Sequence, residues 1–207
     1  MNQLRLLVLG ALAAFCLLGR PSQAQVVEVA RSGDWINYEG RSSQGDRMCG
    51  IRSGGISSRS MFIKYFEGNN TFSFQIYNAA WTIPSEVNVR VAVELGSTYR
   101  SSDLQAIGHP REDLLPARVE FSVLFEGSGE FWTAFRQAST GRLIFLTGNE
   151  GSWRISLAGS NAATSTMSSC IQRLNQGTRP FDAGRVPGAQ GSATSTPFDV
   201  PAGALKD

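Results

Sequence analysis

The chain has 207 residues, with 19 basic and 17 acidic side chains and a formal net charge of +2 at neutral pH. Arg5 and Arg20 both lie within the first 24 residues, so loss of that segment leaves 17 basic and 17 acidic side chains. Because binding to nucleic acids or anionic membranes depends on clustered Lys and Arg, this balance argues against both kinds of partner.

The first 24 residues have the order of a secretory signal peptide. Arg5 precedes an apolar run at positions 6–18, and a Gly-Arg-Pro sequence ends that run. Small residues at the last and third-last positions predict cleavage between Ala24 and Gln25. A membrane-spanning helix needs about 20 apolar residues, so this run is too short for an anchor. The sequence predicts a periplasmic or secreted protein without a transmembrane segment after cleavage.

Cleavage would remove Cys16 and leave two cysteines, Cys49 and Cys170. An even number of cysteines in an exported protein indicates a disulfide, because the compartment is oxidising. The bridge would close a loop of about 120 residues, to which chain entropy assigns roughly 4–5 kcal/mol. Two free buried thiols are the alternative. A redox-active pair is disfavoured, because catalytic dithiols usually lie two residues apart.

Residues 25–175 are expected to form one β-rich domain, because apolar and polar residues alternate along most of it. The pattern is clear at 72–76, where Phe72, Phe74 and Ile76 alternate with polar residues. Such alternation is typical of antiparallel strands with one face in the core. The predicted strands cover 34–38, 47–52, 61–66, 72–76, 87–95, 119–125, 142–147 and 153–157. We expect an antiparallel β-sandwich or partly closed barrel of seven or eight strands.

Two segments have a helical period instead. A short internal helix is predicted over 131–138, with Ser128 as a candidate cap, and Trp132 lies off its apolar stripe and is expected to be exposed. A C-terminal helix is predicted to begin at Ser160 and to run to 174, with Cys170 on its apolar face. Because Cys49 shares a strand face with apolar residues, the disulfide would attach this helix to the sheet.

Residues 176–207 are expected to be a flexible tail. They include five Gly and four Pro in 32 residues and show no hydrophobic period, so they cannot bury enough apolar surface to become ordered. The tripeptide Pro-Phe-Asp occurs twice in the tail, which makes Phe181 and Phe198 candidate anchors for a partner. Chance recurrence, or packing of Phe181 against the last helix, are the alternatives.

Catalysis has little support in the sequence. His109, the only histidine, lies in a polar stretch at 96–116 that also holds several acids, and a hydrolase using this loop is one alternative function. No serine stands in a G-x-S-x-G turn, and we expect His109 to be exposed and dispensable. One histidine and two paired cysteines are too few ligands for zinc, and no phosphate-binding glycine loop follows a strand, so no cofactor is expected.

Tryptophan side chains suggest a second alternative, a small-ligand or glycan-binding module. Trp81 and Trp132 are the candidates for an exposed stacking surface, and Trp132 is retained as a candidate binding residue. Trp153 alternates with the buried residues of its strand, so core packing is the competing interpretation for the tryptophans as a group.

The order of these features resembles the invasion-associated locus B family of Gram-negative periplasmic proteins. The resemblance covers 33–174 and rests on an early Gly-Asp-Trp strand, Cys49, the Phe-Ser-Phe-Gln-Ile strand, a Val-rich strand, and the block Trp-Arg-Ile-Ser-Leu-Ala-Gly-Ser at 153–160 before a helix. The second, central cysteine pair usual in that family is missing. The resemblance implies a periplasmic or surface-exposed β-rich domain, sometimes linked to host-cell entry, without catalytic residues.

Together these features predict a non-enzymatic exported envelope protein. We expect it to bind a macromolecular partner, an envelope or host protein, or to support the cell surface.

Overall fold

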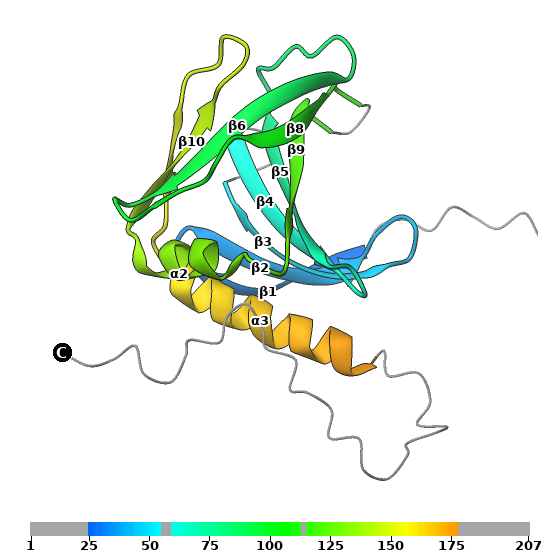
Figure 1. Ribbon diagram of the computed structural model, residues 1–207. Helices are drawn as coiled ribbons and strands as arrows, with labels where there is room; N and C mark the ends of the chain where they lie inside the picture. The colour runs from blue at the N-terminus through cyan, green and yellow to red at the C-terminus, as the bar shows by residue number, and fades with distance from the viewer. Residues whose placement is uncertain (1–24, 55–58, 113–114, 178–207) are drawn as a thin grey trace, which may run out of the picture.

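The computed structural model describes residues 25–54, 59–112 and 115–177, in which it forms one antiparallel sheet of 11 strands and two helices (Figure 1). The strands are β1 (Gln25–Ser32), β2 (Trp35–Arg41), β3 (Arg47–Ser53), β4 (Arg59–Phe66), β5 (Thr71–Asn78), β6 (Val87–Leu95), β7 (Tyr99–Arg100), β8 (Leu104–His109), β9 (Arg118–Leu124), β10 (Thr140–Phe145) and β11 (Trp153–Ser156). The helices are α2 (Gly129–Gln137) and α3 (Ser160–Gly177).

The strand order is β1-β2-β3-β4-β5-β9-β8-β6-β10-β11, and β7 pairs with β6. The predicted mainly-β class is confirmed, and each predicted strand overlaps an observed one. The expected count of seven or eight strands is wrong. All strands belong to one curved sheet, and its end strands β1 and β11 do not pair with each other, so it is not closed.

Three strands were missed, β1, β7 and β8. β1 has the sequence QVVEVARS, in which adjacent valines break the alternation. β7 and β8 fall in the polar stretch at 96–116, which was wrongly expected to be a loop. The buried positions of β8 hold only Ala106 and Gly108, which give almost no hydrophobic signal, whereas its Ile107 is exposed.

The core lies on the face of the sheet that turns toward the helices. On β5 this face holds Phe72, Phe74 and Ile76, all nearly inaccessible to solvent. The β5–β9 register sets Phe74 opposite Phe121, with ring centroids 4.8 Å apart and an interplanar angle of 7°. α2 covers the pair, since Phe131 meets Phe74 edge-on at 5.4 Å.

α3 lies alongside β1, β2 and β3 (Figure 1). The predicted disulfide is confirmed: Cys49 on β3 and Cys170 on α3 are bonded, with their Cα atoms 6.1 Å apart. Near the start of the helix, the Asn37 amide donates a hydrogen bond of 2.8 Å to the Ala163 carbonyl. The last helix is therefore attached to the sheet by a covalent bond and a buried polar contact.

The internal helix corrects two predictions. Trp132 is buried, with an exposed fraction of 0 %, and its ring lies 4.9 Å from that of Phe72. Because α2 contacts the sheet on one side and α3 on another, more than one stripe of it is covered. Ser128 is the N-cap residue but forms no side-chain cap; its hydroxyl donates to the Phe125 carbonyl instead.

The predicted signal peptide at 1–24 and most of the predicted tail, with Phe181 and Phe198, lie outside the described residues. Within the described ranges, neither helix combines the length and apolar character that a membrane crossing requires.

Candidate functional site

A groove lies at the seam where the sheet fails to close. There the end of β11 approaches the start of β2: the Trp35 indole donates to the Ser156 carbonyl at 3.2 Å, and the Asp34 amide donates to the Ala158 carbonyl at 3.0 Å. A Cβ at Gly33, whose φ is +56°, would lie 2.3 Å from the Ala158 oxygen. Glycine therefore permits this close approach.

Beside these contacts the strands diverge and leave an open groove of about 440 Å³, within the roughly 300–1,000 Å³ of small-molecule sites. Its apolar lining comes from Ile36, Met61, Leu143, Trp153 and Ile155. Its charged lining comes from three arginines and one aspartate: Arg31, Arg59, Arg154 and Asp34. The groove thus combines an apolar wall with an excess of positive charge.

One arginine of the groove, Arg59, contacts a cluster of side chains at the rim. The Arg59 guanidinium lies 4.8 Å from the centroid of the Trp153 ring and 3.5 Å from a Glu150 oxygen. Trp81 stacks on Trp153 with centroids 5.2 Å apart. Glu150 accepts the indole N–H groups of both Trp153, at 2.8 Å, and Trp81. These contacts join residues of β4, β11 and two loops.

The rim cluster also sets the charge of Glu150. Partial burial raises the pKa of its carboxyl, but the indole donors of Trp153 and Trp81, the charge of Arg59 and a backbone hydrogen bond lower it by more, so the net pKa lies below its ordinary value. Glu150 is therefore ionised at neutral pH and forms an ion pair with Arg59.

A second candidate region is the sheet edge at β1. Eight large apolar side chains are exposed among the described residues, and three of them, Val26, Val27 and Val29, stand within four positions of this strand, with exposed fractions of 51, 64 and 46 %. Among the strands that the structure describes, β1 pairs only with β2. Its other edge therefore offers unpaired backbone groups beside an apolar surface, the combination that pairs with a further strand.

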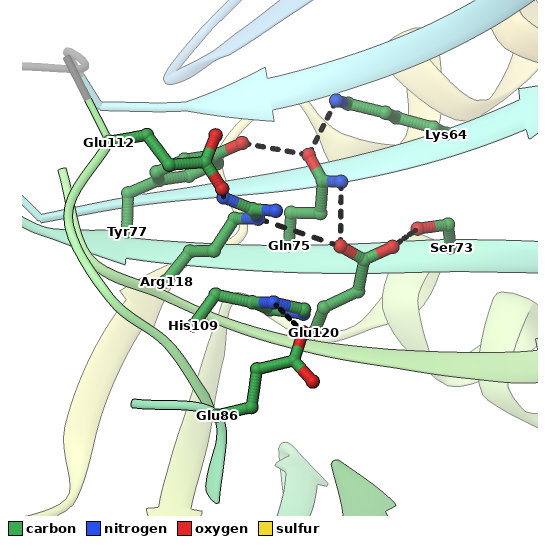
Figure 2. Close-up of polar contacts among 9 residues, drawn as sticks. All are labelled: Lys64, Ser73, Gln75, Tyr77, Glu86, His109, Glu112, Arg118 and Glu120. Atoms are coloured by element: carbon green, nitrogen blue, oxygen red, sulfur yellow. Dashed lines mark hydrogen bonds and ion pairs between the residues drawn. The ribbon is translucent and has the colours of Figure 1, made fainter. Parts of the chain in front are cut away.

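A third region is a polar network on the outer face of the sheet (Figure 2). Cross-strand register brings Gln75 of β5 beside Glu120 of β9, and their side chains form a 2.9 Å hydrogen bond. Gln75 also accepts from Lys64 and from the Tyr77 hydroxyl. Ser73 donates to the other Glu120 oxygen at 3.0 Å. One amide and one carboxylate thus join three strands.

Burial changes the acid–base behaviour of this face. It lowers the pKa of the Lys64 ammonium and raises the pKa of the Tyr77 phenol to about 12. Tyr38, which lies over Gly50 in the space that a Cβ would fill, also has its pKa raised by burial. Neither phenol is therefore a base near neutral pH, and the network serves to hold strands together.

His109 does not meet the requirements of a hydrolytic site. It lies on β8, not in a loop, and its side chain is 18 % exposed, which corrects the expected exposure. Its Nδ1 lies 3.3 Å from a Glu86 oxygen. In residues 25–54, 59–112 and 115–177 no hydrogen bond joins it to a hydroxyl or thiol, although a nucleophile would need such a contact.

The tryptophans are already engaged by other side chains. Trp35 and Trp132 are buried, and Trp81 is stacked on Trp153 on one side and meets Phe145 edge-on at 5.4 Å. A glycan-stacking surface needs an open ring face, and the partly buried Trp81 has one of its faces covered by Trp153. Neither is there, within the described ranges, a group of three or more His, Cys, Asp or Glu able to hold a metal ion.

Comparison with known proteins finds no match: no family model fits the chain, and no curated protein or solved structure is significantly similar to it. The groove residues Arg59, Glu150 and Arg154 were missed by sequence reasoning. Their chemistry arises from contacts between distant segments, and no local motif marks them.

Proposed function

We propose that this chain is a non-enzymatic exported envelope protein that binds a protein partner by strand addition at β1. The observation that carries the proposal is the exposure of Val26, Val27 and Val29 along an unpaired sheet edge. An extended segment of a partner would gain main-chain hydrogen bonds from the edge and apolar contacts from the valines.

The usual devices that protect an edge are weak in β1. The strand contains neither Pro nor Lys, and its charges are partly neutralised, because Glu28 pairs with Arg31 at 3.1 Å and lies 3.8 Å from Arg52. A bulge between Glu28 and Ala30 is the one protective feature. Exposed edges without further protection attract other strands.

The bulge favours a partner of different sequence over a second copy of this chain. In a two-fold pair of β1 strands, each copy would bring its own irregularity into a short antiparallel ladder. An extended segment of another protein can adapt its register to the bulge. We therefore assign the edge to an envelope or host protein, in line with the predicted periplasmic or secreted location and with the resemblance to the invasion-associated locus B family.

The test uses mature protein that carries two substitutions, Val26→Lys and Val29→Lys. Two charged side chains at the edge should abolish capture of the partner from native envelopes, whereas Leu124→Lys, at an equally exposed aliphatic position (59 %) on β9, should not. The captured partner should also slow hydrogen exchange of β1 amides. Partner binding that survives in the double variant would overturn the proposal. It would also be overturned if the wild-type chain formed a dimer and the double variant were a monomer.

A further inference from the structure

We propose that the seam groove binds a small apolar carboxylate, with the arginines at its rim holding the anion and Met61, Leu143 and Ile155 contacting the apolar body. This inference is independent of strand addition at β1, because it rests on a different set of residues. It is based on the charge of the groove lining, on the contacts of Arg59 and on the apolar wall.

The charge of the lining favours an anion. Three arginines and one aspartate line the groove. Arg31 is paired with Glu28, but Arg154 forms no ion pair with any residue that the structure describes. An arginine without a carboxylate partner can offer two parallel N–H donors to a ligand carboxylate. Arg154 is therefore the cation in the groove that is available to pair with the carboxylate of a ligand.

Arg59 is already positioned for the same task. Its guanidinium lies 4.8 Å from the centroid of the Trp153 ring and 3.5 Å from a Glu150 oxygen, although 61 % of the side chain is exposed, and Trp81 stacks on Trp153. A cation with such contacts loses less conformational entropy on binding a ligand than one without them. Glu150 uses its oxygens mainly for the two indole N–H groups, so the guanidinium keeps donors for an anion.

The apolar wall selects the rest of the ligand. Met61, Leu143 and Ile155 come from β4, β10 and β11 and face the groove together. A ligand made only of polar groups would leave this wall wet, whereas a hydrocarbon or aromatic body would cover it. The volume of about 440 Å³ admits a small molecule, and the open side gives it a path from solvent.

The experiment measures binding of phenylacetate to the mature, disulfide-bonded chain by calorimetry and by intrinsic tryptophan fluorescence, to which Trp153 of the groove contributes. Phenylethanol, which lacks the anion, and acetate, which lacks the apolar body, are the matched ligands. We expect phenylacetate to bind more tightly than either, and its affinity to fall as salt is added. Equal affinity for phenylethanol, or no binding of phenylacetate, would overturn the proposal.

Two substitutions locate the site. Arg154→Gln and Arg59→Gln should each weaken phenylacetate binding about 5–10-fold, as expected for loss of a charge-assisted hydrogen bond. Arg142→Gln is the control, because Arg142 lies opposite Arg154 on β10 but outside this groove. Arg59 also packs on Trp153, so thermal unfolding is compared for each variant; no hydrogen bond or ion pair joins the Arg154 side chain to another of the described residues. Unchanged affinity in Arg154→Gln would contradict the assignment.

The β1 variant separates this proposal from the previous one. Val26→Lys with Val29→Lys should leave phenylacetate affinity unchanged, because neither valine lines the groove. If phenylacetate binding disappears in that folded variant, the ligand is bound at the edge and the groove assignment is wrong.

Discussion

The two faces of β4, β5 and β9 are stabilised by different kinds of contact. On the inner face, Phe74 and Phe121 stack and α2 covers them. On the outer face of the same strands, Gln75 and Glu120 connect their neighbours by hydrogen bonds. The inner contacts remove large apolar areas from water. The outer hydrogen bonds replace hydrogen bonds that the same groups form with water in the unfolded chain, so the net stabilisation by the outer network should be much smaller.

The largest expected effect is on the inner face. Phe74→Ala should lower the free energy of unfolding by about 3–5 kcal/mol, because it leaves a cavity between Phe121 and Phe131. Phe62→Ala on the outer face, where the ring is only partly buried, should cost about 1–2 kcal/mol. Urea denaturation of both variants measures the difference. Equal decreases in the free energy of unfolding would contradict the difference between the two faces.

The disulfide strengthens the inner side by a different mechanism. Replacing Cys49 by Ala should lower stability by about 2–5 kcal/mol, mainly through the larger freedom of the unfolded chain. Cys170→Ala should produce the same loss, and the double variant should add little, since either change opens the same bridge. Two thiols that react freely with an alkylating agent in native protein would contradict the bond.

The outer network should respond less. Glu120→Gln places an amide N–H₂ where Ser73 and Gln75 now donate, so one hydrogen bond is lost and the cost should be about 1–3 kcal/mol. Arg136→Gln on α2, a charge with no shown role in the network, is the control. A loss as large as that of Phe74→Ala would remove the distinction between the faces.

The groove rim allows a test by pH. Because the folded pKa of Glu150 lies below its ordinary value of 4.5, its contribution is complete above that pH and disappears as the pH falls through the folded pKa. Wild type should therefore lose more stability than Glu150→Gln on acidification from pH 5 to pH 3. Parallel stability curves for the two proteins over this range would show that Glu150 does not couple to folding.

The smallest effect is expected at His109. Its one described polar contact is with Glu86, whose side chain is 72 % exposed, so loss of this contact should cost less than about 0.5 kcal/mol, and loss of the partly buried ring should bring the total for His109→Ala to about 1 kcal/mol at most. Any binding activity of the protein should survive the substitution. Loss of a hydrolytic activity in a folded His109→Ala variant would instead support the hydrolase alternative.

Much of the fold follows from local pattern. Alternation identified the strand at 72–76 and the face on which Phe72, Phe74 and Ile76 lie, because side-chain direction in a strand has a fixed period of two. The pairing of Cys49 with Cys170 followed from the cysteine count and from their positions on apolar faces. The facing of a side chain depends on neighbours in the chain, and two cysteines allow only one pairing within the chain, so the sequence alone was sufficient for both.

Other features depended on contacts that no local window contains. β1 lacks alternation because it is exposed at the sheet edge, and Trp132 is buried because α2 has neighbours on more than one side. The Arg59–Glu150 pair joins residues that are far apart in the chain, and the groove beside it exists because β11 meets β2 only at one corner. Composition and periodicity determine which face of an element is apolar. Only the tertiary structure decides which elements cover that face, and where the covering stops.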